Sequence, residues 1–355
     1  MMETPLGIAE LAAALERAAE WEPARAAYAR AFTEARAARS VQGMAEATRG
    51  AARVLREMGR VDEAEELAEL SLEIATRASL PRETARAANV LGIILYARGA
   101  IHEAAQRYEW ALELARELRD DDLIGLACAN LGVVANIRGA FGAAFHFYLE
   151  NIAAAVRTGN VQASVLGYNN LGLLAADMRE WMQADLLFHR ALELAEQSGD
   201  TPVIPMLLLN RAEPLIQVGE LELAQEVLDR AEQMAEATRS VPELAEVARF
   251  RGLLARRRGD EGGASGHLAR SLLLATRAGL RLQRAEALEQ LALLHHDAGH
   301  VEDAHANLAE ACAEFFAAGA ARDCARCRDL LAAWPPPADD APAGTVPALR
   351  IAGAA

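Results

Sequence analysis

Side chains that are able to bind a metal gather near the C-terminal end of the sequence. They are His295, His296, His300, His305, Cys312, Cys324 and Cys327. Imidazole and thiolate are the groups that zinc prefers. However, only one Cys-x-x-Cys pair is present, on an expected helix, and the remaining residues do not complete a standard zinc motif. We therefore expect core cysteines and neither a metal nor a cofactor; a metal site and a redox or regulatory thiol are the alternatives.

No catalytic motif is recognisable in the chain. All 36 basic residues are arginine, and the lack of lysine excludes a Schiff-base lysine, a P-loop lysine and a kinase-type lysine. A nucleophile elbow, a Gly-rich phosphate loop and a His-Glu-x-x-His motif are missing as well. Carboxylate runs such as Asp120 to Asp122 are typical of solvated turns, and we expect this run to cap the next helix. The sequence therefore predicts a protein that is not an enzyme.

Charge and composition limit the partners. The chain has 355 residues and a formal net charge of −15, which disfavours nucleic acid and anionic membranes as partners. Its four unevenly placed cysteines suit a reducing compartment. The N-terminal segment lacks a basic region, and no uncharged apolar run reaches the ~18 residues of a membrane span. We therefore expect a cytoplasmic, bacterial protein.

The strongest regularity is a 40-residue repeat. Its anchors are Gly59, Gly99, Gly139, Gly219, Gly259 and Gly299, with Arg179 in the one gap and Ala19 one step earlier. Five residues after each anchor stands alanine: Ala24, Ala64, Ala104, Ala144, Ala184, Ala224, Ala264 and Ala304. Alanine or glycine stands seven residues before each anchor, and a mostly large residue nine residues after it. Such a fixed period indicates a repeat architecture.

The spacing of these columns predicts helices. Offsets of three, four and seven residues mark one face of a helix. Each repeat therefore reads as a helix A, a turn at the anchor and a helix B, with the glycine in the left-handed conformation that ends helix A. Pro214 falls within helix A of the sixth repeat, where a proline removes a hydrogen bond and predicts a kink. That kink is either tolerated or part of a ligand site.

At this point the sequence resembles the tetratricopeptide repeat (TPR). The segments NLGVVANIRGAFGAAFHFYLENIAAA from Asn130 and NLGLLAADMREWMQADLLFHRALELA from Asn170 carry the Leu-Gly, Gly, Ala, aromatic and small-residue columns of that family. The 40-residue unit resembles the long variant found in kinesin light chains, Leu-Gly-Asn-type scaffolds, Rap-like regulators and the sensor regions of large bacterial transcription activators. The resemblance implies an all-α, right-handed superhelical solenoid. We expect eight TPR hairpins and a C-terminal capping helix in residues 1–334, then a disordered Pro/Ala-rich tail in 335–355.

The resemblance also indicates which residues line the binding groove. In TPR proteins the groove is lined by a second stripe of helix A, which here stands three, six, ten and thirteen residues before each anchor. Arginines dominate its N-terminal end, the centre is apolar with asparagines, and two more arginines follow in the seventh repeat. The candidate binding residues, including an asparagine column nine residues before the anchor, are Arg49, Arg53, Arg56, Arg86, Asn89, Tyr96, Asn130, Val133, Asn136, Leu166, Asn169, Asn170, Leu173, Asn210, Glu213, Arg249 and Arg256.

These residues have two interpretations. Arginine grips carboxylates and asparagine pairs with an extended backbone, so the stripe predicts a groove for a peptide or protein segment with acidic and apolar elements. Alternatively, the leucines pack against neighbouring helices, and the asparagines bond to the next helix. We expect a non-enzymatic scaffold or adaptor for protein–protein interaction. The alternative is a signalling regulator that senses a peptide or small effector by changing its superhelical shape.

Overall fold

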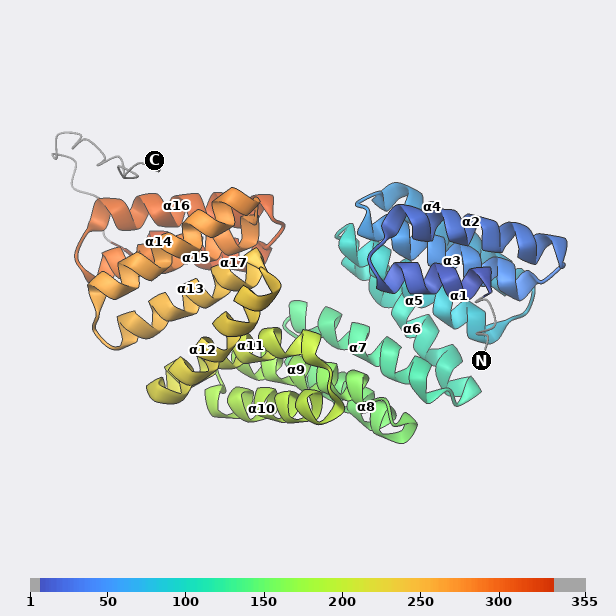
Figure 1. Ribbon diagram of the computed structural model, residues 1–355, viewed down its shortest axis with the longest axis horizontal. Coiled ribbons are helices and arrows are strands. Elements are labelled where there is room, and N and C mark those ends of the chain that lie inside the picture. The colour runs from blue at the N-terminus through green and yellow to red at the C-terminus, as the bar shows by residue number, and fades with distance from the viewer. Residues whose placement is uncertain (1–6, 335–355) are drawn as a thin grey trace. The chain divides into compact units, whose positions relative to one another are not determined.

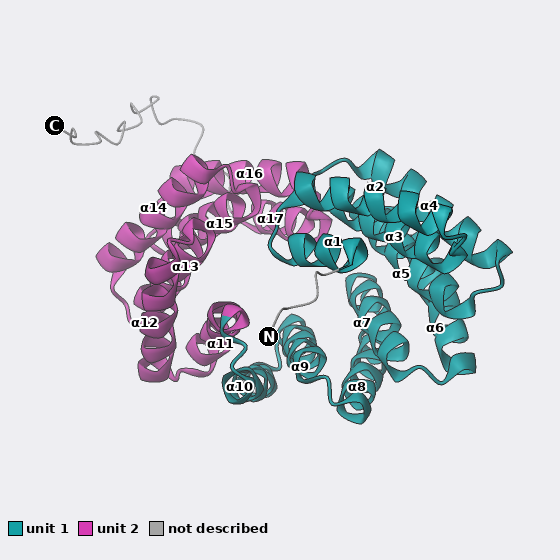
Figure 2. Cartoon of the chain, turned by 45° about the vertical axis from the view of Figure 1, so that its right-hand side comes forward, with its two compact units in different colours: residues 1–201 teal, residues 202–355 magenta. Residues whose placement is uncertain are grey.

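The structure is a computed structural model that describes residues 7–334. Within that range it contains α-helices, one short 3-10 helix and no strand. The chain divides into two compact units, residues 1–201 and 202–355 (Figure 2). The tail expected to be disordered, 335–355, lies outside the described residues.

Unit 1 consists of five helical hairpins (Figure 1). Odd-numbered helices are the A helices and even-numbered ones the B helices. The hairpins are α1 (Ile8–Arg17) with α2 (Trp21–Ala37), α3 (Val41–Glu57) with α4 (Val61–Arg77), α5 (Pro81–Ala97) with α6 (Ile101–Leu118), α7 (Asp121–Ile137) with α8 (Phe141–Thr158), and α9 (Val161–Asp177) with α10 (Trp181–Ser198).

Unit 2 continues the same pattern with three hairpins and a single last helix. They are α11 (Ile204–Val218) with α12 (Leu221–Thr238), α13 (Val241–Arg257) with α14 (Glu261–Ala278), α15 (Arg281–Asp297) with α16 (Val301–Ala317), and then α17 (Ala321–Ala333). The predicted eight hairpins and capping helix are therefore confirmed for the described part of the chain.

The turns confirm the role of the anchor column. Its six glycines have φ between 72° and 92°, a left-handed conformation that glycine adopts without a steric penalty. Arg179 and Ala19 occupy the same column with φ of 60° and 56°. At the end of α3 the N–H of Gly59 donates to the carbonyl of Arg56 (2.9 Å), and the next N–H donates to Leu55 (2.9 Å). These two bonds satisfy carbonyls that the helix end leaves unpaired.

The small and large columns meet in the core. All eight alanines of the column five residues after the anchor have no exposed surface. Opposite the large column, a Cβ added to Gly132 would lie 2.4 Å from a ring carbon of Tyr148, and one added to Gly172 would lie 2.6 Å from Phe188. The small residues on helix A therefore make room for the rings of helix B. This close approach buries Tyr148 and Phe188 almost completely.

Buried polar residues on helix B tie it to helix A. Three of them stand in one column, twelve residues after the anchor, and each donates to the carbonyl of the residue 26 positions earlier. The bonds are Ser71 to Ala45 (2.8 Å), Asn151 to Gly125 (2.9 Å) and Ser271 to Ala245 (2.8 Å). Because a buried hydroxyl or amide without a partner is costly, these bonds explain why the core admits polar residues there.

Helix α11 departs from the pattern. A short 3-10 helix, Thr201–Val203, precedes it, so α11 begins three residues later in the repeat than α13 does. Pro205 lies in its first turn, where the missing N–H has no helical partner to lose. The helix continues through Pro214 to Val218. The kink predicted for Pro214 stays a prediction.

Candidate binding groove

The predicted binding residues lie on the A helices. Within each unit these helices line the inner side of the curve made by the hairpins, and the B helices form the outer side (Figure 2). The residues that meet helix B stand on one face of helix A, so the stripe lies on a different face. We call the surface formed by this stripe the A face.

Arg53 is held by a carboxylate from the first helix. Its Nε and Nη2 donate to Oε1 and Oε2 of Glu16, both at 2.7 Å. The hydroxyl of Tyr28 donates to Glu16 Oε2 at 2.6 Å. Burial and the carboxylate of Glu16 raise the pKa of Tyr28 to about 12, so the hydroxyl keeps its proton. Burial alone would raise the pKa of Glu16, but hydrogen bonds from Arg53 and Tyr28 lower it overall.

The other arginines of this end also have carboxylate partners. Arg49 and Arg86 both bind Glu83, the second with 3.2 Å between Nη1 and Oε1. The side chain of Glu83 is only 4% exposed. Arg56 binds Glu57. A ligand carboxylate at this end of the A face would therefore have to displace a carboxylate of the chain itself.

Two of the candidate asparagines, one from the stripe and one from the column nine residues before the anchor, bond to each other across neighbouring A helices. Asn130 Nδ2 on α7 donates to Asn89 Oδ1 on α5 at 2.9 Å, and Asn89 is only 2% exposed. Of the two interpretations of the asparagines, these residues follow the one that connects helices. Asn169 is buried, whereas Asn170 and Asn210 are half-buried.

A second kind of side-chain hydrogen bond joins neighbouring A helices, and it connects the same two columns of the repeat each time. Asn136 Nδ2 donates to Asp177 Oδ2 at 2.8 Å, and Arg256 Nε donates to Asp297 Oδ2 at 2.8 Å. In each case the donor stands three residues before its anchor, and the acceptor stands two residues before the next anchor. The repeat thus places the same bond in both units.

The centre of the A face exposes leucines. Leu126, Leu166 and Leu173 have 46%, 43% and 41% of their surface exposed. Val133 packs partly into the core beside Tyr148. Tyr96 is half-buried against the neighbouring core, and burial raises its pKa.

Leu126 and Leu166 also line a cavity of about 360 Å³ between α7, α8 and α9. We call it the leucine cavity. Ala129 and Ala163 complete its apolar wall, and the buried amide of Asn151 forms part of its polar end. Its volume lies at the small end of the range of ligand pockets. This arrangement suits an apolar side chain that enters beside a few polar groups.

A second cavity, of about 320 Å³, lies in unit 2 and is lined only by A helices. Met206, Leu209 and Asn210 come from α11, Glu243, Glu246, Arg249 and Phe250 from α13, and Leu282 and Glu286 from α15. We call it the acidic cavity. Of the predicted residues it contains Arg249 and Asn210, and Glu213 lies near enough to Arg249 to raise its pKa. Glu243 and Phe250 were not predicted from the sequence, although Glu243 stands three residues before Glu246, which is part of the stripe.

Arg249 is the centre of the acidic cavity. Its Nη2 lies 2.5 Å from Glu246 Oε2 and its Nε 3.4 Å from Glu286 Oε2. The guanidinium carbon stacks 4.1 Å above the ring of Phe250. Burial would lower the pKa of Arg249, but the nearby glutamates raise it overall, so the group stays charged.

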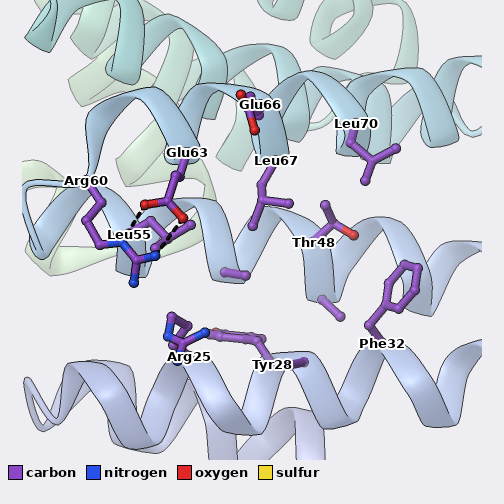
Figure 3. Close-up of a pocket in the computed structure, with 13 residues that line it drawn as sticks. Arg25, Tyr28, Phe32, Thr48, Leu55, Arg60, Glu63, Glu66, Leu67 and Leu70 are labelled. Atoms are coloured by element: carbon purple, nitrogen blue, oxygen red, sulfur yellow. Dashed lines mark hydrogen bonds and ion pairs between the residues drawn. The ribbon is translucent and has the colours of Figure 1, made fainter.

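A third cavity lies between the B helices α2 and α4, with α3 as its floor (Figure 3). Its volume is about 360 Å³. Figure 3 shows the ion pair of Arg60 and Glu63 at one end of the cavity. The apolar side chains of Phe32 and Leu70 lie at the other end. This cavity could not be predicted from the sequence, because no stripe of the repeat predicts a site between B helices.

The cysteines and histidines near the C-terminal end do not assemble into a metal site. Among residues 7–334, no group of three or more His, Cys, Asp or Glu side chains is arranged to hold a metal ion. Cys324 and Cys327 belong to the core beneath α17, and burial raises the pKa of Cys327 to about 12. The Sγ atoms of Cys312 and Cys324 lie 2.9 Å apart. The imidazole of His296 stacks on Trp334, with 4.2 Å between the ring centres.

The comparisons with known proteins agree with this geometry. The family model described as "Tetratricopeptide repeat" matches residues 43–117, which span α3 to α6. Residues 43–117 contain tetratricopeptide repeats. The hairpins of both units share the 40-residue columns described above. No curated protein sequence matches the chain.

Solved structures with a similar fold include three with low sequence identity. Aspartyl phosphate phosphatase F from Bacillus subtilis is 14% identical, with a TM-score of 0.64 over 78% of this chain and 72% of that chain. A Rap protein complexed with competence and sporulation factor is 12% identical, with a TM-score of 0.61 over 92% and 98%. BtubC (BKLC) from P. vanneervenii is 22% identical, with a TM-score of 0.55 over 62% and 92%. At these identities the likeness concerns the TPR fold alone.

None of the described helices is both long enough and apolar enough to span a membrane.

Proposed function

We propose that this TPR chain is a non-enzymatic protein–protein interaction module of the cytoplasm. It acts as a scaffold or adaptor that holds a peptide or protein segment on the A face of its solenoid. The net charge of −15 favours a protein over a nucleic acid or an anionic membrane as the partner.

The exposed leucines of the A face carry this proposal. Leu126, Leu166 and Leu173 come from two neighbouring A helices, and each leaves more than 40% of its surface exposed. Removing apolar surface from water contributes about 25 cal/mol per Å², part of which offsets the entropy lost on binding. A segment that covers these leucines and places a side chain in the leucine cavity would gain that energy.

The second candidate function is a peptide-sensing regulator. The similar Rap structures include one complexed with competence and sporulation factor and one in complex with the Phr* peptide. In this chain, a segment that bridges successive A helices would change the angle between them. Small-angle scattering with and without a bound peptide separates the two functions, because a scaffold keeps its radius of gyration and a sensor changes it.

The test begins from a random 12-residue peptide library displayed on phage and selected on the whole chain. The selected peptides are synthesised, and their affinity is measured by fluorescence anisotropy. We expect the Leu126→Glu, Leu166→Glu double variant to bind at least tenfold more weakly, because two carboxylates then occupy the apolar surface.

Leu186→Glu is the matched control. Leu186 is 60% exposed on the B helix α10, so this variant should bind the peptides like the wild type. Circular dichroism verifies that all variants keep their helices. Failure to select any peptide, or equal binding by the double variant, would contradict the proposal.

A further inference from the structure

The acidic cavity of unit 2 has more negative than positive groups. Three carboxylates line it, from Glu243, Glu246 and Glu286, and Arg249 is the one basic residue in the lining. Such a lining favours a positively charged ligand, whereas the arginine stripe predicts from the sequence a ligand with acidic groups. The cavity is more than an acidic cluster, because Met206, Leu282 and the ring of Phe250 form apolar walls beside the carboxylates.

Arg249 cannot neutralise all three carboxylates. Its Nη2 is used by Glu246 at 2.5 Å, and its longer contact with Glu286, 3.4 Å from Nε, lacks hydrogen-bond geometry. The Oε2 atom of Glu243 is buried and has no hydrogen-bond partner. A buried carboxylate oxygen without a partner costs free energy until a donor reaches it.

The raised pKa of Glu286 also shows that the cavity has too little positive charge for its carboxylates. Burial and the carboxylate of Glu246 raise its pKa to about 7, although Arg249 opposes the shift. The charged groups that face Glu286 are Arg249 and Glu246 from α13 and Asp323 from α17. The two acidic neighbours make the anionic form of Glu286 costly unless a further cation is present.

We infer that the acidic cavity receives a positively charged side chain, an arginine or lysine, of the bound protein segment. This inference rests on the proposed function and specifies the partner at this part of the A face. The cationic head lies between Glu243 and Glu286 and supplies the missing donors. An apolar neighbour in the same segment packs on Met206 and Leu282, which are 36% and 42% exposed.

Binding of the cation is coupled to the loss of a proton from Glu286. The cation favours the anionic carboxylate, so affinity rises with pH through the pKa of about 7. At pH 6 about one-tenth of the molecules have an anionic Glu286, whereas at pH 8 about nine-tenths do. Affinity for a basic segment is therefore about tenfold higher at pH 8 than at pH 6.

The experiment uses the whole chain and three pools of N-acetylated, C-amidated hexapeptides. The fixed third position is arginine in one pool, aspartate in the second and alanine in the third. The other positions vary among Ala, Leu, Ser, Asn and Gly. Peptides retained by the immobilised protein are quantified by mass spectrometry at pH 6 and pH 8. We expect at least tenfold more retention from the arginine pool than from the alanine pool at pH 8.

Two variants and one control locate the effect. Glu243→Gln and Glu286→Gln each keep the shape of the side chain but remove its charge, and each should lower retention of the arginine pool at least fivefold. Glu226→Gln makes the same change at an exposed position on the B helix α12, and its retention should equal that of the wild type. With Glu286→Gln, the difference between pH 6 and pH 8 should vanish.

The outcomes separate this inference from the proposed function. Equal or greater retention of the aspartate or alanine pool would overturn the cation inference and leave peptide binding intact. Retention of no pool would contradict both. If circular dichroism shows that Glu286→Gln does not fold, Glu243→Gln decides, because its unpartnered oxygen holds no helix in place.

Discussion

Gly132 allows a sharp test of how the repeat packs. In a helix, alanine is favoured over glycine by about 1 kcal/mol, so propensity alone predicts that Gly132→Ala stabilises the protein. The structure predicts the opposite. The new Cβ would lie 2.4 Å from Cε1 of the buried Tyr148, far inside the ~3.5–4.0 Å at which carbon atoms attract.

The magnitude follows from a matched control. Gly266 lies within α14, and a Cβ added there meets nothing within 4 Å. The propensity gain is the same in both variants, so the difference between Gly132→Ala and Gly266→Ala isolates the cost of overpacking, about 1–3 kcal/mol. We expect Gly266→Ala to stabilise the chain by up to about 1 kcal/mol and Gly132→Ala to destabilise it or leave it unchanged.

The chain itself suggests the compensating change. In the sixth repeat the same two positions hold Ala212 and Leu228, both fully buried. Adding Tyr148→Leu should therefore make Gly132→Ala less costly, with a coupling of at least ~1 kcal/mol in the double-mutant cycle. Urea unfolding followed by circular dichroism measures all four proteins. If Gly132→Ala raised the unfolding midpoint as much as Gly266→Ala does, the packing argument would be refuted.

Three further predictions concern the core, the ion pairs and the cysteines. Ala184→Leu should lower stability by roughly 1–3 kcal/mol, because Ala184 has no exposed surface; an unchanged melting temperature would refute close packing of that column. The lowered pKa of Glu16 stabilises the folded state above the pKa of the unfolded chain, and this contribution is lost as the pH falls through the folded pKa. Between pH 7 and pH 3 the wild type should thus lose more stability in urea titrations than Glu16→Gln, whereas equal losses would mean that the bond with Arg53 adds nothing. Because Cys324 and Cys327 are core residues, a chelator should leave the melting temperature unchanged, and about one zinc per chain by elemental analysis would contradict that assignment.

The fold could be predicted from the sequence because the same pattern of small and large residues occurs in eight successive repeats. A single glycine or alanine is weak information, but a column such as Gly59 to Gly299 determines the ends of successive helices. Arg179 stands in the same column and also adopts the left-handed conformation, which was predicted only for the glycines. The late start of α11 was missed, because Pro202 and Pro205 alter one helix without altering the period.

The candidate site could be predicted only in part. The stripe identifies the A face, since it depends on the geometry of one helix. It does not identify which carboxylate meets which arginine. Glu83 is 34 residues from Arg49, and Glu16 is 37 residues from Arg53. Those pairings depend on the packing distance and angle between neighbouring helices. No local pattern in the sequence specifies that geometry.

The bridge that joins Asn136 to Asp177 and Arg256 to Asp297 has a consequence for how such a chain can grow. Donor and acceptor stand at fixed positions relative to consecutive anchors. The two positions are 41 residues apart, so a copied stretch of 40 residues carries at most one partner of a bridge but keeps every column in register. Tandem duplication, deletion or exchange of whole repeats therefore preserves the spacing between the donor and acceptor columns, whereas the insertion of one residue between them would shift a donor away from its acceptor. Lengthening this protein by multiples of its repeat is accordingly far less disruptive than altering it by a residue or two.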